Sequence, residues 1–397
     1  MVACGICYAA RLIIRYIPQA VEVVAVLGTA ASIAYYLLCL WSAELFLKRE
    51  HAGGDGRTTP PVSILKPLKG TDPEIYESFR SQCFQDYPEY EIIFGVNDAD
   101  DPAVQLVERL KGEFPNRQIS LQICAENLGV NAKVSNLIQM LRKAHYDYFI
   151  VSDSDIRVEP DYLRRVTAPL ADPKVGLVTC LYRGVAAKTF GSRLEVLGIS
   201  TDFVPGVLAA RTLEGGIRFG LGSTLAFRRR DLESIGGFEA FADYLADDYE
   251  LGKRISDDGL RVEISDVVVE TFLPAYSFSE FLRHQLRWAR TIREARRGGY
   301  AGLLLTFGFL WSLLGVLASR GAVWAWTLLG VTACVRLIMA LTVAQNVLRD
   351  SQLLRSLWLI PVRDLLGVAV WAAGLVGNTI FWRGKEFQLK DGKLAPL

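Results

Sequence analysis

The sequence predicts an α/β domain, built on a mostly parallel sheet and held between membrane-spanning helices. Long apolar segments lie near both ends of the 397-residue chain, and about 20 apolar residues suffice for a helix to cross a hydrocarbon core. Between them, short strand-like runs alternate with helical patterns, which is typical of a parallel sheet covered by helices. We therefore expect a transmembrane anchor at 1–48, a globular domain at 49–298, and a bundle of about three spans with a tail at 299–397.

The expected membrane spans are four apolar segments. The first, Val23 to Ala43, contains no charged residue, exceeds the apolar region of a signal peptide, and is followed by no convincing cleavage site. Three more are expected nearer the C-terminus: Tyr300 to Ser319, Gly321 to Leu348 with Arg336 inside it, and Leu365 to Trp382. The amphipathic segment Ser351 to Pro361 fits the membrane interface.

Basic residues next to the spans set the expected orientation. Five of them border the globular domain: Lys48, Arg49, Arg293, Arg296 and Arg297. By the positive-inside rule, they place this domain in the cytoplasm. Arg11 and Arg15 before the first span, and the basic tail WRGKEFQLKDGK, point the other way. Three C-terminal spans would put that tail outside, so either the rule bends here or one segment is re-entrant.

Four strands are expected in the first half of the globular domain, because short apolar runs rich in β-branched and aromatic residues recur there. These runs are Val62–Leu65, Tyr90–Val96, Ile119–Cys124 and Tyr148–Ser152. Because helices separate them, the strands are expected to run parallel, with their carboxyl ends at one edge of the sheet. That edge is where open α/β sheets bind ligands.

Helices are expected between these strands. One opens at Asp72 and Pro73, because proline is tolerated in the first turn of a helix. The next runs from Asp101 to Phe114, with apolar residues at helical spacing on one face. Asp101 stands just before a proline and fits the N-cap of that helix. A third helix is expected over Ala132 to Arg142.

Acidic residues follow two of the expected strands. Asp98 follows the second strand, where its carboxylate suits a hydrogen bond from a base or ribose or, alternatively, a helix cap. Asp153 and Asp155 follow the fourth, and side chains two residues apart share a face. A divalent cation such as Mg²⁺, typically held by one or two carboxylates and diphosphate oxygens, would offset the cost of burying their charge. The short D-x-D pattern alone fits a solvated turn equally well.

Two more motifs carry charged residues. LADDYELG (245–252) places Asp247 and Asp248 at the start of a helix, where the helix dipole favours acidic residues. HQLRWAR (284–290) lies just before the second expected span. Each has a structural alternative, namely a helix cap for one of the two aspartates and a basic helix flanking the membrane for the second motif.

In this order, the motifs resemble those of GT-A glycosyltransferases of family 2 and its relatives. The resemblance is closest to the ceramide glucosyltransferase group, which includes the bacterial hopanoid-associated glycosyltransferases. It covers about residues 60 to 300 and rests on seven segments: SILKPLKGTDPE (63–74), VNDADDPA (96–103), GVNAKVSNLI (129–138), SDSDIRV (152–158), KVGLVTCLYRG (174–184), IGGFEAFADYLADDYELG (235–252) and HQLRWART (284–291). It implies a GT-A, nucleotide-sugar-binding fold for the globular domain, which would be the catalytic domain.

The resemblance also implies roles for individual residues. The donor site would be formed by Lys66, Asp98, Asp153, Lys133 and Asn136. Asp155, with Asp153, would bind a divalent cation, either Mg²⁺ or Mn²⁺. Asp248 would be the catalytic base. Arg287 and Trp288 would form the floor beneath the acceptor and the diphosphate.

His284 departs from the family pattern. That pattern has Gln or Arg three residues before the arginine of the Arg-Trp pair, whereas this chain has His284 there and Gln285 one residue too late. An imidazole at this position would suit a metal ligand or a hydrogen-bond donor to the diphosphate. The alternative is a structural histidine whose hydrogen bonds are satisfied within the fold.

The residue chemistry fits transfer from a UDP-sugar. Such a transfer needs positive charge at the leaving diphosphate, a base for the acceptor hydroxyl, and reactants held in line. Asp155 with a cation, Arg287 and Asp248 fill the first two needs. One base on the acceptor side implies direct displacement, which inverts the anomeric centre. The neighbouring spans favour a lipid acceptor, and the apolar stretch 203–210 would line either its route or the protein core.

We therefore expect transfer of one hexose, glucose by preference, from a UDP-sugar to a hydroxyl of a membrane lipid such as ceramide. Transfer of N-acetylglucosamine to a hopanoid polyol such as bacteriohopanetetrol is an alternative. A metal-dependent lipid nucleotidyl or phosphoryl transferase is another, although the chain has no G-x-x-x-x-G-K-[ST] loop. A nucleotide-sugar receptor would have no use for Asp248. The formal net charge of +1 gives no reason to expect a nucleic-acid partner.

Overall fold

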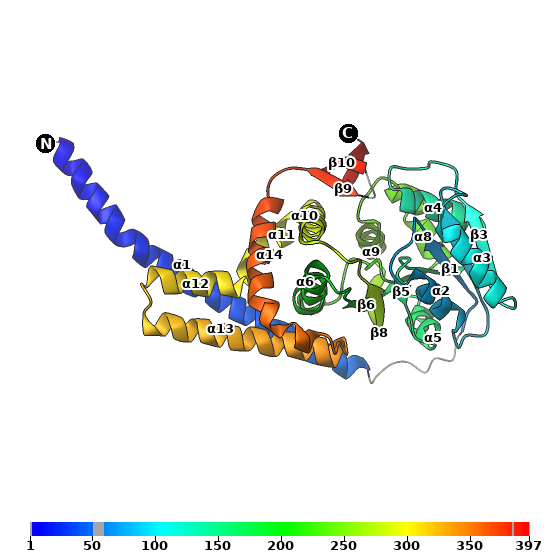
Figure 1. Cartoon of the computed structure of the whole chain (residues 1–397), viewed down its shortest axis with the longest axis horizontal. Coiled ribbons are helices and arrows are strands. Elements are labelled where there is room, and N and C mark those ends of the chain that lie inside the picture. The colour runs from blue at the N-terminus through cyan, green and yellow to red at the C-terminus, as the bar shows by residue number, and fades with distance from the viewer. Residues whose placement is uncertain (1, 51–58, 383–384, 397) are drawn as a thin grey trace.

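The computed structural model describes residues 2–50, 59–382 and 385–396, with side chains from residue 18 onward except those of 49 and 50. Arg11, Arg15 and Arg49 therefore lie outside the described side chains. Figure 1 shows a globular α/β domain from which a group of long helices extends to one side. The N-terminal helix α1 spans Val2–Glu50.

An eight-stranded sheet forms the centre of the globular domain, in the order β3-β2-β1-β4-β7-β6-β8-β5. Its strands are β1 Val62–Pro67, β2 Tyr90–Val96, β3 Gln118–Ile123, β4 Tyr148–Val151, β5 Ile156–Arg157, β6 Val175–Val185, β7 Leu225–Arg228 and β8 Arg261–Phe272. Within this sheet, the pairings β1–β2, β1–β4, β2–β3 and β6–β8 are parallel, while β4–β7, β6–β7 and β5–β8 are antiparallel. The sheet is therefore mostly parallel, as expected, and the four predicted strands are confirmed to within two residues at each end.

The register of the parallel strands brings the acidic segments to one edge of the sheet. Leu65 of β1 pairs with Val151 of β4, and Lys66 pairs with Phe94 of β2. Residues that follow Val96 of β2 and Val151 of β4 therefore leave the sheet at the same edge, on either side of β1. Strands β1 and β2 are buried on both faces, which explains their nearly continuous apolar sequences.

Helices cover the sheet on both faces (Figure 1). The three predicted ones are α2 Ile75–Cys83, α3 Ala103–Glu113 and α4 Ala132–Leu141. The N-cap of α3 is Pro102 and not Asp101 as predicted, although Asp101, one residue earlier, accepts a hydrogen bond from the backbone N–H of Ala103 at 2.9 Å. Pro73 precedes α2 and lies outside its first turn. The others in this domain are α5 Tyr162–Thr167, α6 Phe190–Gly198, α7 Val204–Leu213, α8 Arg229–Ser234, α9 Asp247–Asp257 and α10 Phe278–Ala295.

One of the two main hydrophobic clusters of the domain continues into the apolar helices. It contains Phe149 and Phe227 of the sheet together with Tyr36 and Phe46 of α1 and Met339 of the helix α13, Val323–Thr342. This shared core fixes the apolar helices to the globular domain. The stretch 203–210 contributes four residues to it, Val204, Val207, Leu208 and Ala209, so most of that stretch is protein core.

Four helices, as far as the chain is described, are long and apolar enough to cross a membrane. They cover Pro18–Lys48, Phe190–Leu213, Val323–Val347 and Leu357–Gly374. A further pair, Arg297–Thr306 and Gly308–Ala318, is bent by 51° at the break between its helices. Helices α1, α12 (Gly308–Ala318) and α13 (Val323–Thr342) pack together, whereas α14 (Ile360–Gly374) packs on α10 and α6.

Two of the predicted spans differ from the structure. Tyr300 to Ser319 is not one straight helix, and hydroxyls of α1 bind the carbonyl groups at its break: Ser32 donates to Leu305 at 2.7 Å and Tyr36 to Thr306 at 2.9 Å. Such bonds satisfy backbone groups that a broken apolar helix leaves free. The predicted span Leu365 to Trp382 is wrong in its second half, because α14 ends at Gly374 and Thr379–Trp382 is strand β9.

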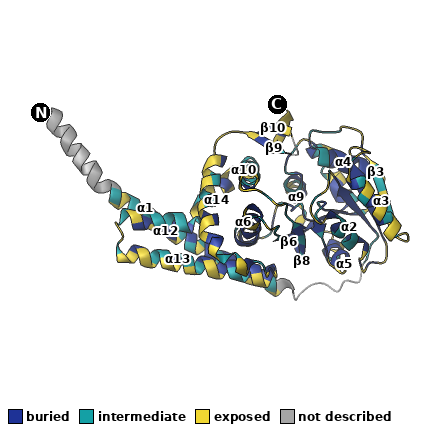
Figure 2. Ribbon diagram, in the orientation of Figure 1, coloured by how far each residue is buried: buried dark blue, intermediate teal, exposed yellow. Residues whose placement is uncertain are grey.

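Exposed apolar side chains gather on the helices that extend from the domain. Figure 2 shows much exposed surface on α13 and α14, in contrast to the buried sheet. Large hydrophobic residues are exposed on α1 and α13: Val23, Leu27, Leu37, Trp41, Val323, Trp324, Trp326, Val331 and Ile338. So large an apolar surface is typical of contact with lipid. Trp358, in the segment expected at the interface, is 70% exposed.

The charged residue inside the third expected span is buried and paired. Arg336 is 2% exposed, and its guanidinium contacts Asp364 of α14 at 2.7 Å and Asp202 at 2.5 Å. Asp202 belongs to a π-helical turn, Ile199–Phe203, between α6 and α7. This cluster joins α13 and α14 to the globular domain, and pairing of this kind is usual for charges inside apolar helices.

The C-terminal tail forms a small antiparallel sheet on the globular domain. Its strands are β9 Thr379–Trp382, β10 Lys385–Lys390 and β11 Lys393–Pro396. Leu245 of the globular domain shares one hydrophobic cluster with the tail. The tail and the globular domain therefore lie on the same side of the apolar helices.

Candidate active site

Lys133 joins the two main acidic segments. Its ammonium group lies 2.9 Å from Asp153 Oδ1, at the end of β4, and 3.0 Å from Asp247 Oδ2, at the start of α9. Lys133 itself is placed by α4, whose first turn is capped by the side chain of Asn131. Burial alone would lower the pKa of Lys133, but the carboxylates of Asp153 and Asp247 outweigh it and raise that pKa.

Gly222 joins Asp153 to Asp248. Its backbone N–H donates to Asp248 Oδ2 at 2.7 Å, and its carbonyl oxygen accepts the backbone N–H of Asp153 at 3.2 Å. A Cβ at Gly222 would lie 3.0 Å from Asp153 Oδ2 and 3.3 Å from Asp248 Oδ2. The two carboxylates therefore flank the same glycine. Sequence reasoning missed this residue, although the glycines of FGLGST (219–224) between two apolar runs were a signal for a close backbone approach.

The surroundings of Asp248 act on its ionised form in opposite directions. Its Oδ1 accepts the backbone N–H of Tyr249 at 2.8 Å. Burial and the neighbouring carboxylate of Asp247 raise the pKa of Asp248 to about 6, against the opposing effect of Lys133. An aspartate with this pKa is ionised near neutral pH and is basic enough to take a proton.

Asp155 is a second buried carboxylate whose surroundings disfavour its ionised form. The hydroxyl group of Thr271, on β8, donates a hydrogen bond to it. Burial, followed by repulsion from Asp153, raises the pKa of Asp155 to about 6. Sequence reasoning did not identify Thr271, which belongs to a strand that the local pattern did not reveal.

Lys66 lies beneath the acidic edge. It is fully buried, and its ammonium group donates to Ser152 Oγ at 3.0 Å and to the carbonyl oxygen of Asp153 at 2.9 Å. Burial lowers the pKa of Lys66 to about 8. Both of these partners belong to the segment that follows β4, so Lys66 holds this segment in place and adds positive charge below it.

Asp98 follows strand β2, and Asn136 lies on α4 next to the end of that strand. Asp98 is exposed and accepts a hydrogen bond from the backbone N–H of Asp100 at 3.0 Å. Asn136 is buried and exchanges two hydrogen bonds with Asn97, at 2.6 and 3.2 Å. The pair fixes α4 to the end of β2, next to Asp98.

The HQLRWAR motif lies in α10, which begins with a capping box formed by Ser277 and Glu280. Arg287 contacts His284 Nδ1 at 3.2 Å, and the other imidazole nitrogen lies 3.4 Å from the carboxylate of Glu195 on α6. Gln285 also donates to Glu195, at 2.7 Å. These contacts favour the structural alternative for His284, because its imidazole bridges α10 to α6.

Aromatic rings connect α10 to the acidic cluster. The ring of Phe203 packs edge-on against Trp288 at 5.7 Å and lies 5.3 Å from the ring of Tyr182 on β6. Burial raises the pKa of Tyr182, and the carboxylates of Glu195 and Asp248 raise it further. Phe203 thus links Trp288 on α10 to Tyr182 on β6.

The acidic cluster offers few protein ligands to a metal. In the described part of the chain, no group of three or more His, Cys, Asp and Glu side chains is arranged to hold one. The pair Asp153 and Asp155 suits Mg²⁺ or Mn²⁺ only if a ligand supplies further oxygens, as diphosphates commonly do. Burial and the carboxylate of Asp153 raise the pKa of Asp155 and so disfavour its ionised form, which a bound cation would stabilise.

Comparison with known proteins assigns the family. The model of glycosyl transferase family 21 matches residues 24–395. The chain belongs to this family. Two similar proteins of Caenorhabditis elegans are ceramide glucosyltransferase 3, 28% identical over 269 residues, and ceramide glucosyltransferase 1, 29% identical over 209 residues. The matches cover 67% and 52% of this chain, but only 58% and 44% of those relatives.

A solved structure agrees with the fold expected for family 21. It is the mannosyltransferase PcManGT from Pyrobaculum calidifontis in complex with GDP-Man and Mn²⁺. Its TM-score is 0.55 at 22% sequence identity, and the match covers 89% of this chain and 97% of that one. This likeness confirms the GT-A fold predicted from the sequence.

Proposed function

We propose that this family 21 protein transfers one hexose, glucose by preference, from a UDP-sugar to a hydroxyl group of a membrane lipid such as ceramide. The observation that carries the proposal is the arrangement of Asp153 and Asp248 around Gly222, at the carboxyl edge of the sheet. Because both carboxylates lie beside Gly222, Asp153 would serve the sugar donor and Asp248 would act as the base for the acceptor, within a few ångströms of the same backbone position. The names of the two nematode relatives support the lipid acceptor.

On the donor side, Asp153 and Asp155 would hold a divalent cation together with the diphosphate. That cation, when bound, neutralises the charge that develops on the leaving diphosphate. Lys133 and Lys66 add fixed positive charge beside and beneath the two aspartates. Asp98, exposed at the neighbouring strand end, would contact the base or ribose.

On the acceptor side, Asp248 would accept the proton of the attacking hydroxyl as the new glycosidic bond forms. Its pKa of about 6 leaves it ionised near neutral pH. A single base acting on the acceptor implies inversion at the anomeric carbon, so that an α-linked donor gives a β-glycoside. Arg287 and Trp288 on α10 would form the floor beneath the acceptor.

The acceptor would arrive from a bilayer. Helix α14 packs on α10, and exposed apolar residues cover the adjoining helices α1 and α13. We propose a multi-pass membrane protein whose globular domain and C-terminal sheet both face the cytoplasm. The tail lies on the cytoplasmic side if the chain crosses the membrane an even number of times after the globular domain. In that case either the bent pair, Arg297–Thr306 and Gly308–Ala318, or α14 does not cross the membrane completely.

The proposal is tested with the purified full chain in detergent and either Mg²⁺ or Mn²⁺. UDP-glucose, UDP-galactose and UDP-N-acetylglucosamine are each offered with ceramide, diacylglycerol and bacteriohopanetetrol, and UDP release is measured beside lipid mass. We expect UDP and a ceramide heavier by one hexose. Addition of N-acetylhexosamine to the hopanoid would mean that the donor is UDP-N-acetylglucosamine and the acceptor a hopanoid, in place of UDP-glucose and ceramide. Release of pyrophosphate would indicate nucleotidyl transfer. Donor binding without any product would contradict enzymatic transfer.

A further inference from the structure

The C-terminal sheet binds the loop that leads into α9. The backbone N–H of Leu394 donates to the carbonyl oxygen of Asp243 at 2.8 Å, and that of Leu245 donates to the carbonyl oxygen of Gly392 at 3.1 Å. The tail therefore adds backbone hydrogen bonds to residues 243–245. Only Ala246 separates this loop from Asp247, the first residue of α9.

The same loop is anchored in the small core of the tail. Leu245 is 7% exposed and lies in one hydrophobic cluster with four tail residues: Ile380, Phe387, Leu389 and Leu394. No other globular-domain residue belongs to the buried set of that cluster within the described chain, although Val130 packs against it. Withdrawing the tail would expose Leu245, and an apolar residue resists such exposure.

The turn between β10 and β11 is shaped to fit the loop. Asp391 and Gly392 have φ values of 49° and 79°, as in the two-residue hairpin turn for which Asp-Gly is favoured. A Cβ at Gly392 would lie 3.3 Å from the ring of Tyr244. The glycine is therefore needed for its backbone conformation and for its close approach to the loop.

Helix α10 holds the other side of the tail. Arg293 donates to the carbonyl oxygens of Gly374 at 2.7 Å and Gly377 at 3.0 Å, in the connection from α14 to β9. Glu294 accepts the backbone N–H of Asp391 at 3.2 Å. The tail is thereby tied to the helix that carries Arg287 and to the end of an apolar helix.

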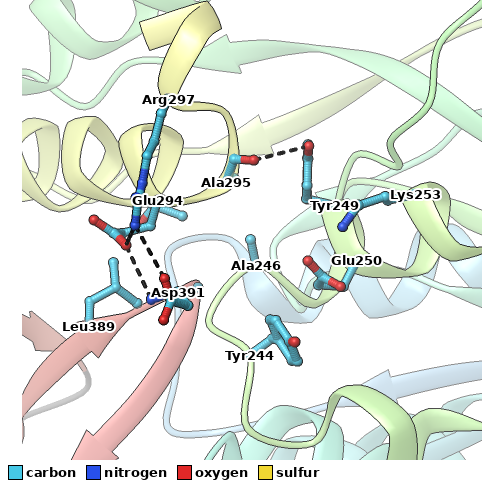
Figure 3. A pocket seen from close by; sticks show the side chains of 12 residues that line it. Tyr244, Ala246, Tyr249, Glu250, Lys253, Glu294, Ala295, Arg297, Leu389 and Asp391 are labelled. Atoms are coloured by element: carbon cyan, nitrogen blue, oxygen red, sulfur yellow. Dashed lines mark hydrogen bonds and ion pairs between the residues drawn. The ribbon is translucent and has the colours of Figure 1, made fainter.

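A cavity separates these contacts from α9. It has a volume of about 330 Å³ and lies between α9, the end of α10 and the tail hairpin. Figure 3 shows Arg297, Glu294 and Asp391 on one side and Tyr249 and Lys253 on the other. Because this space is open, the middle of α9 is not packed against the tail. The tail therefore acts on α9 through residues 243–245, which precede the helix.

The opposite side of the loop is held by α4. Asn131, the cap of α4, donates its backbone N–H to the carbonyl oxygen of Ala242 at 2.9 Å and its side-chain amide to that of Tyr244 at 2.7 Å. Asp243 accepts the backbone N–H of Val130 at 2.9 Å. Residues 242–245 are thus clamped between the helix that carries Lys133 and the C-terminal sheet.

We propose that the C-terminal sheet is a positioning element for the catalytic base: it clamps residues 243–245 against α4 and thereby fixes Asp248 beside Gly222. The inference rests on the proposed function, since it assigns the tail a part in the same reaction. The proposed clamp also couples the end of α14 to Asp248, because Arg293 binds the connection between α14 and the C-terminal sheet.

The test compares two neighbouring tail residues that point to opposite sides. Leu389 is fully buried in the tail cluster, whereas Gln388 is exposed. Leu389→Asp should therefore release the clamp, Gln388→Asp is the matched control, and Leu389→Ile should restore function. A chain that ends at Asn378 removes the sheet altogether. Each is assayed for the rate of sugar transfer at saturating donor, the Kd for the UDP-sugar, and the melting temperature.

We expect Leu389→Asp and the shortened chain to lose about tenfold or more in kcat, with the donor Kd changed by about twofold or less. Gln388→Asp and Leu389→Ile should transfer at the rate of the unaltered chain. Unchanged kcat in both clamp variants would overturn the proposal. Parallel loss of donor binding and melting temperature in both would also overturn it, because the sheet would then serve the fold as a whole.

The same assays separate this inference from the proposed function. If the unaltered chain releases no UDP with any lipid, or if Asp248→Asn transfers sugar at the normal rate, the proposed function fails. If Asp248→Asn is inactive and the clamp variants are fully active, only the positioning role of the tail is lost.

Discussion

Gly222 donates its backbone N–H to the carboxylate of Asp248 at 2.7 Å, across a space that leaves no room for a side chain. The hydrogen bond fixes the carboxylate on the side of the sheet edge where Asp153 lies. It also supports the ionised form of Asp248, since a carboxylate is stabilised by each N–H that it accepts.

Replacing Gly222 by alanine should reduce transfer without unfolding the protein. The new Cβ would lie 3.0 Å from Asp153 Oδ2 and 3.3 Å from Asp248 Oδ2, so at least one carboxylate must move. We expect kcat to fall by about tenfold to a hundredfold, because small displacements of reacting groups are costly. Gly112→Ala on α3 is the control, since nothing lies within 4 Å of its Cβ. Equal kcat for both variants would show that transfer does not depend on the positions of the Asp153 and Asp248 carboxylates beside Gly222.

The pH dependence of kcat/KM for the donor should be bell-shaped. Asp248 must be ionised to act as a base, and its raised pKa of about 6 means that activity falls as the pH drops through that value. Lys66 must be charged, and its lowered pKa of about 8 means that activity falls as the pH rises through that value. The profile is measured on the unaltered chain with saturating lipid. A flat rate down to pH 4.5, near the ordinary range for carboxylates, would contradict the assignment of Asp248.

Removing the charge of Lys133 should lower stability. Lys133→Gln leaves Asp247, a buried carboxylate, without the cation that it shares with Asp153. Breaking a buried ion pair in this way typically costs about 3–5 kcal/mol. The exposed pair of Lys111 with Glu108 offers the control, for which Lys111→Gln should cost about 1 kcal/mol or less. Melting temperatures in detergent compare the two, and an equal small change would mean that Lys133 is not needed to balance the cluster.

The C-terminal tail should be accessible from the same side of the membrane as the globular domain. The two pack together through Leu245, and Figure 1 shows α14 running across the direction of α12 and α13. Single cysteines at Lys390 and at Glu108, both on exposed positions, are labelled with an impermeant reagent in sealed inverted vesicles. Both should react. Reaction of only one would require the tail to leave the domain and would contradict the arrangement.

Much of this fold could be predicted because its signals are local. Strands β1 to β4 are short apolar runs bounded by polar residues, and α4 begins at Asn131 with a normal side-chain cap. The second half of the sheet gives weaker signals. Strand β7 has only four residues, Leu225–Arg228, and it pairs antiparallel with both neighbours. The last span was misplaced because its apolar composition continues past Gly374, where α14 ends, into the connection to β9, in which Gly377 has a φ of +72°.

The candidate site was predictable where a residue follows a strand or opens a helix. Asp153, Asp155 and Asp248 stand at such positions, and the structure brings all three to one edge of the sheet. The contacts that organise them could not be predicted, because they join distant segments. Lys133 meets Asp247 more than a hundred residues along the chain, and Thr271 reaches Asp155 from β8. No local pattern records such pairings.

The central claim is that Asp248 is the base of a sugar transfer to lipid, and Asp248→Asn tests it most directly. The amide keeps the size of the side chain but cannot take up the proton. We predict that the transfer rate falls by about a hundredfold to ten-thousandfold while the Kd for the UDP-sugar changes by about threefold or less. Transfer by Asp248→Asn at the rate of the unaltered chain, with the donor bound equally well, would contradict the account.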